Sequence, residues 1–205
     1  MLFKSSFPAR FGGRLSSVID VRTNDGDMQK YHGMLSIGLL TSKFNLEGPI
    51  VKGRTSFNIS ARRSYLDLLA KPFMPDDEKY SYYFYDINAK INHKFSDRSR
   101  LFLSIYNGKD HFATKFDENT DNEDGSKMNW GNTIASARWN YIFNNRLFSN
   151  TTVAFNNYEL GIHSYMTNQF FGSTENKVNR YSADYRSGIQ DWSYKIDFDF
   201  NPSPI

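Results

Sequence analysis

Seven runs of alternating polar and apolar residues are the feature that most constrains the fold of this chain. In the clearest run, between residues 85 and 95, Ile87 and Ile91 fall on one face and Asn88 and Lys90 on the other. A period of two marks a β-strand whose two faces meet different surroundings. The polar face is rich in charge and amide groups, and the apolar face carries aromatic residues at its ends. A membrane-spanning strand needs this combination, with lipid on one side and a water-filled lumen on the other.

The seven expected strands are joined alternately by short turns and long polar segments. The strands cover residues 31–47, 55–65, 82–95, 100–107, 129–143, 146–158 and 189–200. The short turns fall at 48–54, 96–99, 144–145 and 201–204, and the long segments are 66–81, 108–128 and 159–188. Antiparallel strands with short connections at one end and long ones at the other are typical of an outer-membrane β-barrel.

The composition favours the same fold class. Only 39% of the residues are hydrophobic, yet the 205-residue chain holds 18 Phe and 13 Tyr. Aromatic girdles at the two membrane interfaces would account for this excess, and a soluble, tyrosine-rich β-protein is the alternative. No apolar stretch reaches the ~18–20 residues of a membrane helix, but a tilted barrel strand needs only ~9–11 residues.

Other features narrow the function classes. The chain has no cysteine, which excludes disulfides, thiolate metal sites and a cysteine nucleophile. A net charge of +3 without a basic cluster argues against nucleic-acid binding. The four histidines are scattered without the spacing of metal ligands: His32, His93, His111 and His163. We therefore expect neither an enzyme nor a bound cofactor.

Two motifs come close to known phosphate and calcium sites. The segment 48–55 differs from a P-loop by Arg54 in place of lysine, but a strand and not a helix is expected after it. The acidic run 117–125 offers oxygen ligands for Ca²⁺, yet Asn122 and Met128 stand where an EF-hand loop needs glycine and glutamate. A solvated loop tip is the expected interpretation of this run, and calcium binding is the alternative.

Seven strands cannot form a complete barrel in a membrane. Every backbone N–H and C=O must be paired in hydrocarbon, and bacterial single-chain barrels have an even number of strands, at least eight. The N-terminus, Met1–Lys4, also lacks the apolar core and cleavage site of a signal peptide. We therefore expect this chain to be a piece of a larger barrel protein, with a domain boundary between residues 1–28 and 29–205.

Residues 7–23 resemble the end of the plug domain in TonB-dependent outer-membrane receptors. The residues that carry the resemblance are Pro8, Arg10, Phe11, Gly12, Gly13, Val18, Ile19 and Val21. Phe11 replaces the tyrosine usual in that family, and Asn24 stands where lysine is common. Residues 46–51 and 55–65 are similar to the opening barrel hairpin of the Bacteroidetes branch. The resemblance is specific over residues 7–70 and architectural beyond them.

The resemblance implies an all-β fold: a partial antiparallel transmembrane β-barrel of about seven strands, preceded by the last segment of a plug domain. It implies a place in the cell outer membrane and energy-coupled uptake of a scarce ligand, such as a siderophore, cobalamin, a glycan or a peptide. The implied partners are outer-membrane lipid, a surface lipoprotein and, through the missing part of the plug, the TonB complex. The alternatives are a passive porin or adhesin barrel and a soluble β-barrel that binds a small molecule.

The candidate site residues lie on the polar faces of the expected strands, where they would contact ligand or plug. They are Arg62, Asp86, Asn88, Lys90, Arg138, Asn140, Lys195 and Asp197. Loops on a rigid scaffold often meet a ligand first. In the segment 159–188, Tyr165, Phe170 and Phe171 are therefore candidates for stacking against it.

Overall fold

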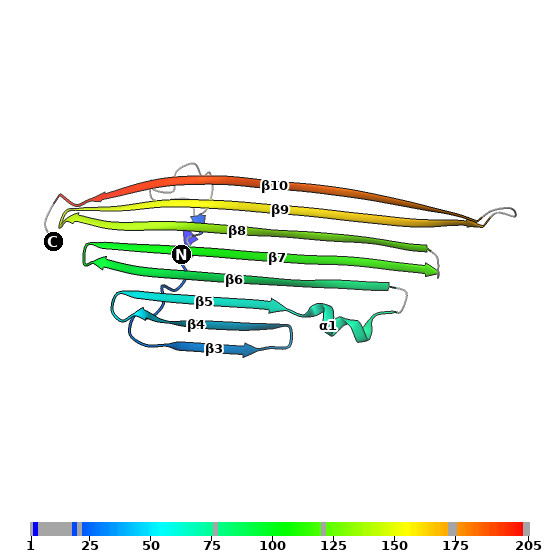
Figure 1. Ribbon diagram of the computed structural model, residues 1–205, viewed down its shortest axis with the longest axis horizontal. Coiled ribbons are helices and arrows are strands. Elements are labelled where there is room, and N and C mark those ends of the chain that lie inside the picture. The colour runs from blue at the N-terminus through cyan, green and yellow to red at the C-terminus, as the bar shows by residue number, and fades with distance from the viewer. Residues whose placement is uncertain are drawn as a thin grey trace.

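One antiparallel sheet of eight strands makes up most of the chain (Figure 1). The computed structural model describes residues 2–3, 18–19, 22–75, 78–119, 122–171 and 176–202. The strand order is β10-β9-β8-β7-β6-β5-β4-β3, so each strand pairs with its neighbour in sequence. The sheet is open, since no hydrogen bonds join β3 to β10 in the described part of the chain. The all-β, antiparallel prediction is thus confirmed.

The later strands are much longer than the first ones, from 6 residues in β3 to 25 in β9 and β10. Their bounds are β3 His32–Ile37, β4 Thr41–Val51, β5 Thr55–Ser64, β6 Glu78–Ser96, β7 Ser99–Asn119, β8 Asn122–Asn144, β9 Leu147–Phe171 and β10 Asn176–Phe200. Helix α1 (Leu66–Ala70) and the 3-10 turn η2 (Lys71–Phe73) lie between β5 and β6. Among the described residues, no helix is long and apolar enough to cross a membrane. A strand of 25 residues, such as β9, extends over about 80 Å.

The predicted single strand at 31–47 is wrong. The chain reverses between Ile37 and Thr41, and β3 pairs with β4 from His32↔Glu47 to Ile37↔Ser42. In the turn, the N–H of Gly38 donates to the carbonyl oxygen of Thr41 at 2.9 Å. The poor alternation of this stretch reflects a turn inside it, and the turn raises the strand count of the sheet to eight.

Two of the three predicted long loops are also wrong. The β7–β8 ladder continues to Asn119↔Asn122, and the β9–β10 ladder continues to Phe171↔Asn176. Segments 108–128 and 159–188 are therefore mostly strand, and so are the described parts of the acidic run, residues 117–119 and 122–125. Backbone pairing does not depend on side-chain polarity, so a strand with water on both faces loses its alternation without ending. Part of the third segment, 66–81, forms α1 and η2.

Three of the predicted short turns lie at one end of the sheet, at the left of Figure 1. They cover residues 52–54, 97–98 and 145–146. Backbone bonds tie each one to the next hairpin, as where the N–H of Lys94 donates to the carbonyl oxygen of Arg54 at 2.7 Å and that of Ile142 to Arg98 at 2.8 Å. These three predicted turns thus share one end, but the β3–β4 turn at residues 38–40 is also short and lies at the opposite end, so the predicted separation of short turns from long connections is met only in part.

The face of the sheet with the apolar side chains is exposed. Two rows of residues cross six strands on this face: Phe57–Ile91–Leu103–Ala137–Val153–Tyr194 and Ile59–Ala89–Ile105–Ala135–Phe155–Trp192. We call these two rows, together with the residues of the same face between them and the short turns, the apolar belt. On the central strands, Ile91, Leu103 and Trp139 keep 41%, 44% and 47% of their surface exposed. The belt ends where the same face of β7 continues into Asn107 and Lys109.

The opposite side, which we call the polar face, holds buried side chains on β5, β6 and β7, whereas on β10 it is exposed at Ser193 and Lys195. Lys90 and Asn92 on β6 are 8% and 2% exposed, and Ser56 on β5 is fully buried. Phe102 is the single buried hydrophobic side chain among the described residues, and it lies on this polar face. On β5 to β7 the burial pattern is therefore the reverse of that expected in water, where apolar side chains pack inside and charged ones face solvent.

Candidate functional site

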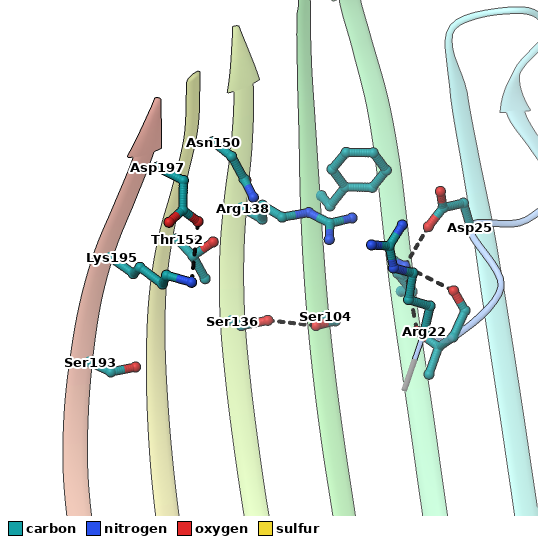
Figure 2. Close-up of a pocket in the computed structure, with 13 residues that line it drawn as sticks. Arg22, Asp25, Ser104, Ser136, Arg138, Asn150, Thr152, Ser193, Lys195 and Asp197 are labelled. Atoms are coloured by element: carbon teal, nitrogen blue, oxygen red, sulfur yellow. Dashed lines mark hydrogen bonds and ion pairs between the residues drawn. The ribbon is translucent and has the colours of Figure 1, made fainter. Parts of the chain in front are cut away.

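A hollow of about 470 Å³ lies on the polar face of strands β6 to β10 (Figure 2). Four of the predicted site residues line it together: Lys90, Arg138, Lys195 and Asp197. Cross-strand register places them in three adjacent rows. Arg138 and Lys195 share one row through Thr152, Lys90 is opposite Ser104 in the row on one side, and Asp197 is opposite Asn150 in the row on the other side. The period-two alternation of the sequence predicts that these residues share one face, and the strand register brings them together in one site.

The small polar residues of the hollow were not among the site residues predicted from the sequence. They are Ser104, Ser136, Asn150, Thr152 and Ser193. The hydroxyl oxygens of Ser104 and Ser136 lie 2.7 Å apart across the β7–β8 pair. Their period-two spacing was visible in the sequence, but without the register nothing distinguished these residues from the other small polar residues of the same strands.

Phe102 lies among three cations at the floor of this site. Its ring centroid is 4.4 Å from Arg138 Cζ, 5.5 Å from Lys90 Nζ and 5.9 Å from Arg100 Cζ. An aromatic face attracts cations, so the ring holds these side chains together where like charges would repel one another. The result is a cationic floor suited to a polar or anionic group.

The other predicted site residues lie outside this hollow. Arg62 and Asp86 pair with each other, with Nε 2.7 Å from Oδ2, and line a smaller hollow of about 210 Å³ with Tyr82. The Tyr82 hydroxyl donates to Asp110 at 2.9 Å. Burial raises the pKa of Tyr82, and the hydrogen bond to the Asp110 carboxylate raises it further. Asn88 is half-buried on the polar face of β6, between Ser60 and Tyr106 in the register.

Several buried polar atoms of this face have no hydrogen-bond partner among the described residues. They are Oδ1 of Asn92, Asn132, Asn140, Asn150 and Asn156, and Nε of Arg138. Most buried polar groups in proteins are hydrogen-bonded to protein or to ordered water, so these atoms are open to water or to polar material that lies on this face. The predicted residue Asn140 belongs to this set.

Residues 22–30, which we call the leading segment, lie against the polar face. Lys90 forms an ion pair with Asp25, and its Nζ donates to the carbonyl oxygen of Thr23 at 3.2 Å. Ser56 Oγ donates to the carbonyl oxygen of Asp25 at 2.9 Å. Gly26, at φ +80°, comes so close to β5 that an added Cβ would lie 2.3 Å from the carbonyl oxygen of Phe57. Thus the predicted site residue Lys90 anchors the segment that precedes the sheet.

A turn at Asp27 shapes this segment. The N–H groups of Gln29 and Lys30 donate to Asp27 Oδ1 at 2.6 and 3.1 Å, and His32 Nε2 lies 2.9 Å from Oδ2. The Gln29 bond, with those from His32 and Lys30, holds the pKa of the Asp27 carboxyl below its usual 3.8. A lowered pKa favours the folded state when the carboxyl is ionised. This stabilisation is therefore present above pH ~4 and is lost as the pH falls through the lowered pKa.

The plug-end residues fall mostly outside the described part of the chain. Pro8, Arg10, Phe11, Gly12, Gly13 and Val21 lie there. Val18 and Ile19 form β2 (Val18–Ile19), which pairs with β1 (Leu2–Phe3) in a two-stranded antiparallel sheet. Of the predicted stacking residues, Tyr165 is on β9, whereas the side chains of Phe170 and Phe171 are outside the described set.

Comparison with known proteins adds no relative. No family model, no curated protein and no solved structure matches this chain. In the part of the chain that the structure describes, no group of three His, Cys, Asp or Glu side chains is placed to hold a metal ion. The function proposed below therefore rests on the sequence and the geometry of the sheet.

Proposed function

We propose that this chain is part of a TonB-dependent outer-membrane receptor that takes up a scarce ligand. The apolar belt would face lipid, the polar face would line the lumen, and the leading segment would be the end of the plug. The inverted burial of the sheet carries the proposal: Leu103 is exposed on the belt, while Lys90 and Asn92 are buried on the other face. This arrangement is favourable when the apolar face contacts hydrocarbon and unfavourable when that face contacts water.

The height of the belt supports a spanning role. On β8, the belt face runs from Ala135 to Phe143 and includes Ala137, Trp139 and Tyr141. A tilted strand crosses the bilayer core with ~9–11 residues, and this stretch together with its flanking residue Thr133 matches that length. The aromatic cluster at its end, where the rings of Tyr141 and Phe143 are 4.8 Å apart, suits an interfacial girdle next to the short turns.

The two sheet edges support a larger barrel. β3 has 6 residues and β10 has 25, so the edges are too unequal to close the sheet on each other. In a membrane both edges need partners, because unpaired backbone groups are costly in hydrocarbon. Additional strands between β10 and β3 would satisfy them, as in the large plugged barrels of this receptor class.

The leading segment favours a plugged receptor over a passive channel. It is tied to the wall by the Lys90–Asp25 ion pair and the Ser56–Asp25 hydrogen bond, and it occupies one side of the polar hollow. A ligand with hydrogen-bonding or anionic groups would meet Arg138 and Lys195 on the other side. Three further points remain predictions from the sequence: that the TonB complex supplies the energy for uptake, that a surface lipoprotein is a partner, and that the protein is not an enzyme.

Cysteine labelling tests the proposal, because the chain has no native cysteine. Single cysteines at Leu103 and Ser104 occupy adjacent positions on opposite faces of β7. In isolated outer membranes, we expect a charged, water-soluble maleimide to label the Ser104→Cys variant at least about tenfold faster than Leu103→Cys, since the apolar face excludes it. A third variant, His111→Cys, should label fast because it continues the face of Leu103 beyond the belt.

The opposite pattern would overturn the proposal. A soluble β-protein would expose Leu103→Cys to the reagent as fully as His111→Cys, in agreement with its exposure in the isolated sheet. It would also leave the protein in the supernatant when membranes are sedimented without detergent.

A further inference from the structure

A second hollow, of about 420 Å³, lies on the other side of the sheet, beyond the apolar belt. Lys109, Gly131 and Glu159 form one cross-strand row there, and Asn129, Gly161 and Arg186 form the next. These rows share their face with Ile105, which precedes Lys109 by four residues on β7, or about 13 Å along the strand. If the belt lies in lipid, this hollow lies at the level of the headgroups.

Two glycines open the hollow. A Cβ on Gly161 would meet no atom within 4 Å, so the surface there is depressed and accessible. A Cβ on Gly131 would lie 2.8 Å from Lys109 Cγ, so the stem of Lys109 runs across this glycine. The missing side chains let the lysine lie along the sheet surface at the edge of the depression.

The charge of the hollow is mainly positive. Lys109 and Arg186 have no acidic partner within 4.0 Å in the described part of the chain. The one carboxylate among the lining residues, Glu159, accepts a hydrogen bond from Asn157 Nδ2 at 2.9 Å. Nearby on the same face, Asp184 lies 2.8 Å from His163 Nδ1 and is not among the lining residues. Two cations and one carboxylate thus line the depression, an excess of one positive charge.

We infer that this hollow binds the phosphate of a membrane-lipid headgroup. Arginine and lysine are the side chains that bind phosphate oxygens through charge-assisted hydrogen bonds. Cations at the edge of a lipid-facing surface meet headgroup phosphates at close range, and the adjoining belt would hold the acyl chains. The inference rests on the proposed function, because it needs the belt to lie in lipid.

The test uses the protein in detergent micelles and a soluble short-chain phosphatidic acid as the probe. We expect saturable binding by calorimetry, and binding at least about tenfold weaker in the Lys109→Gln/Arg186→Gln variant, because each lost charge-assisted hydrogen bond accounts for about that factor. The control, Lys52→Gln/Arg54→Gln, removes the same charges from the exposed turn at the far end of the sheet. This control should bind like the unchanged protein.

Three results would overturn the inference. Equal weakening in both double variants would mean that total charge, and not this hollow, attracts the lipid. Unchanged affinity in the Lys109/Arg186 variant would place the lipid elsewhere. Inorganic phosphate that binds as tightly as the phosphatidic acid would show a site for free phosphate. Sedimentation with membranes separates a failure of this inference from a failure of the proposed function. A protein that stays in the membrane fraction but does not bind the lipid contradicts the inference alone, whereas a protein that leaves the membrane fraction contradicts both the inference and the proposed function.

Discussion

Replacing Leu103 by arginine is expected to destabilise the protein in lipid vesicles by about 2–4 kcal/mol. Leu103 lies in the middle of the apolar belt, between Ile91 and Ala137 on the neighbouring strands. At the bilayer midplane a guanidinium loses its hydration and finds no counter-ion. Urea titration of vesicle-folded protein, followed by the shift of the band between the folded and unfolded forms on a gel, measures the change.

The matched control is His111→Arg, which puts the same side chain on the same face of β7 beyond the belt. Near or outside the interface, a charged residue on the lipid-facing side costs only about 0–1 kcal/mol. A large difference between the two variants supports a belt in lipid. Equal and small effects would instead mean that both positions face water, and the membrane assignment of the sheet would be lost.

Replacing Gly26 by alanine is expected to release the leading segment from the polar face, at a cost of about 2–4 kcal/mol. The residue has φ +80°, which disfavours any side chain, and a Cβ there would lie 2.3 Å from the Phe57 carbonyl oxygen. The colliding atoms belong to the backbone of β5, which is paired on both sides, so we expect the segment to move away from β5. Hydrogen exchange of the backbone amides in residues 22–30 should then speed up by at least about tenfold.

Gly53 is the control position that separates the cost of backbone strain from the cost of a steric collision of the added Cβ. Its φ of +71° is similar, but a Cβ there would meet only Gln29 Nε2, at 3.8 Å. Gly53→Ala should therefore cost the strain alone, about 1–2 kcal/mol. It keeps the N–H that Gly53 donates to the carbonyl oxygen of Met28 at 3.0 Å, so it should speed exchange in the leading segment far less than Gly26→Ala does. If Gly26→Ala has no larger effect than Gly53→Ala, the segment does not pack on the sheet as described.

The sequence predicted the parts of the sheet where the two faces differ. In β5 and β6, Asn58 and Lys90 alternate with Ile59 and Ile91, and the structure pairs these strands as the alternation predicts. The grouping of Lys90, Arg138, Lys195 and Asp197 on one face follows from the same period of two. Turn residues such as Asn144, whose Oδ1 accepts from the N–H groups of Arg146 and Leu147 at 2.9 and 3.0 Å, marked the hairpin ends correctly.

The rest depends on contacts that alternation does not encode. Beyond the belt, β9 and β10 have polar residues on both faces, as at the adjacent His163 and Ser164 of β9, so nothing in their hydropathy distinguishes strand from loop. The cation cluster around Phe102 arises from the register of β6, β7 and β8. The Lys90–Asp25 ion pair joins residues from the leading segment and the sheet. Each of these features links segments whose relative placement is set by pairing and not by local sequence.

The most direct test of the account is the response of each tryptophan to quenchers in lipid and in water. The chain has three tryptophans. Trp139 and Trp192 are exposed on the belt face, whereas Trp130 stacks with Tyr82 at 6.5 Å between ring centroids. In variants that keep one tryptophan each, brominated lipid should quench Trp139 and Trp192 strongly and leave Trp130 bright. If acrylamide in the water quenches all three tryptophans and brominated lipid quenches none of them, the apolar belt does not face lipid and the account is contradicted.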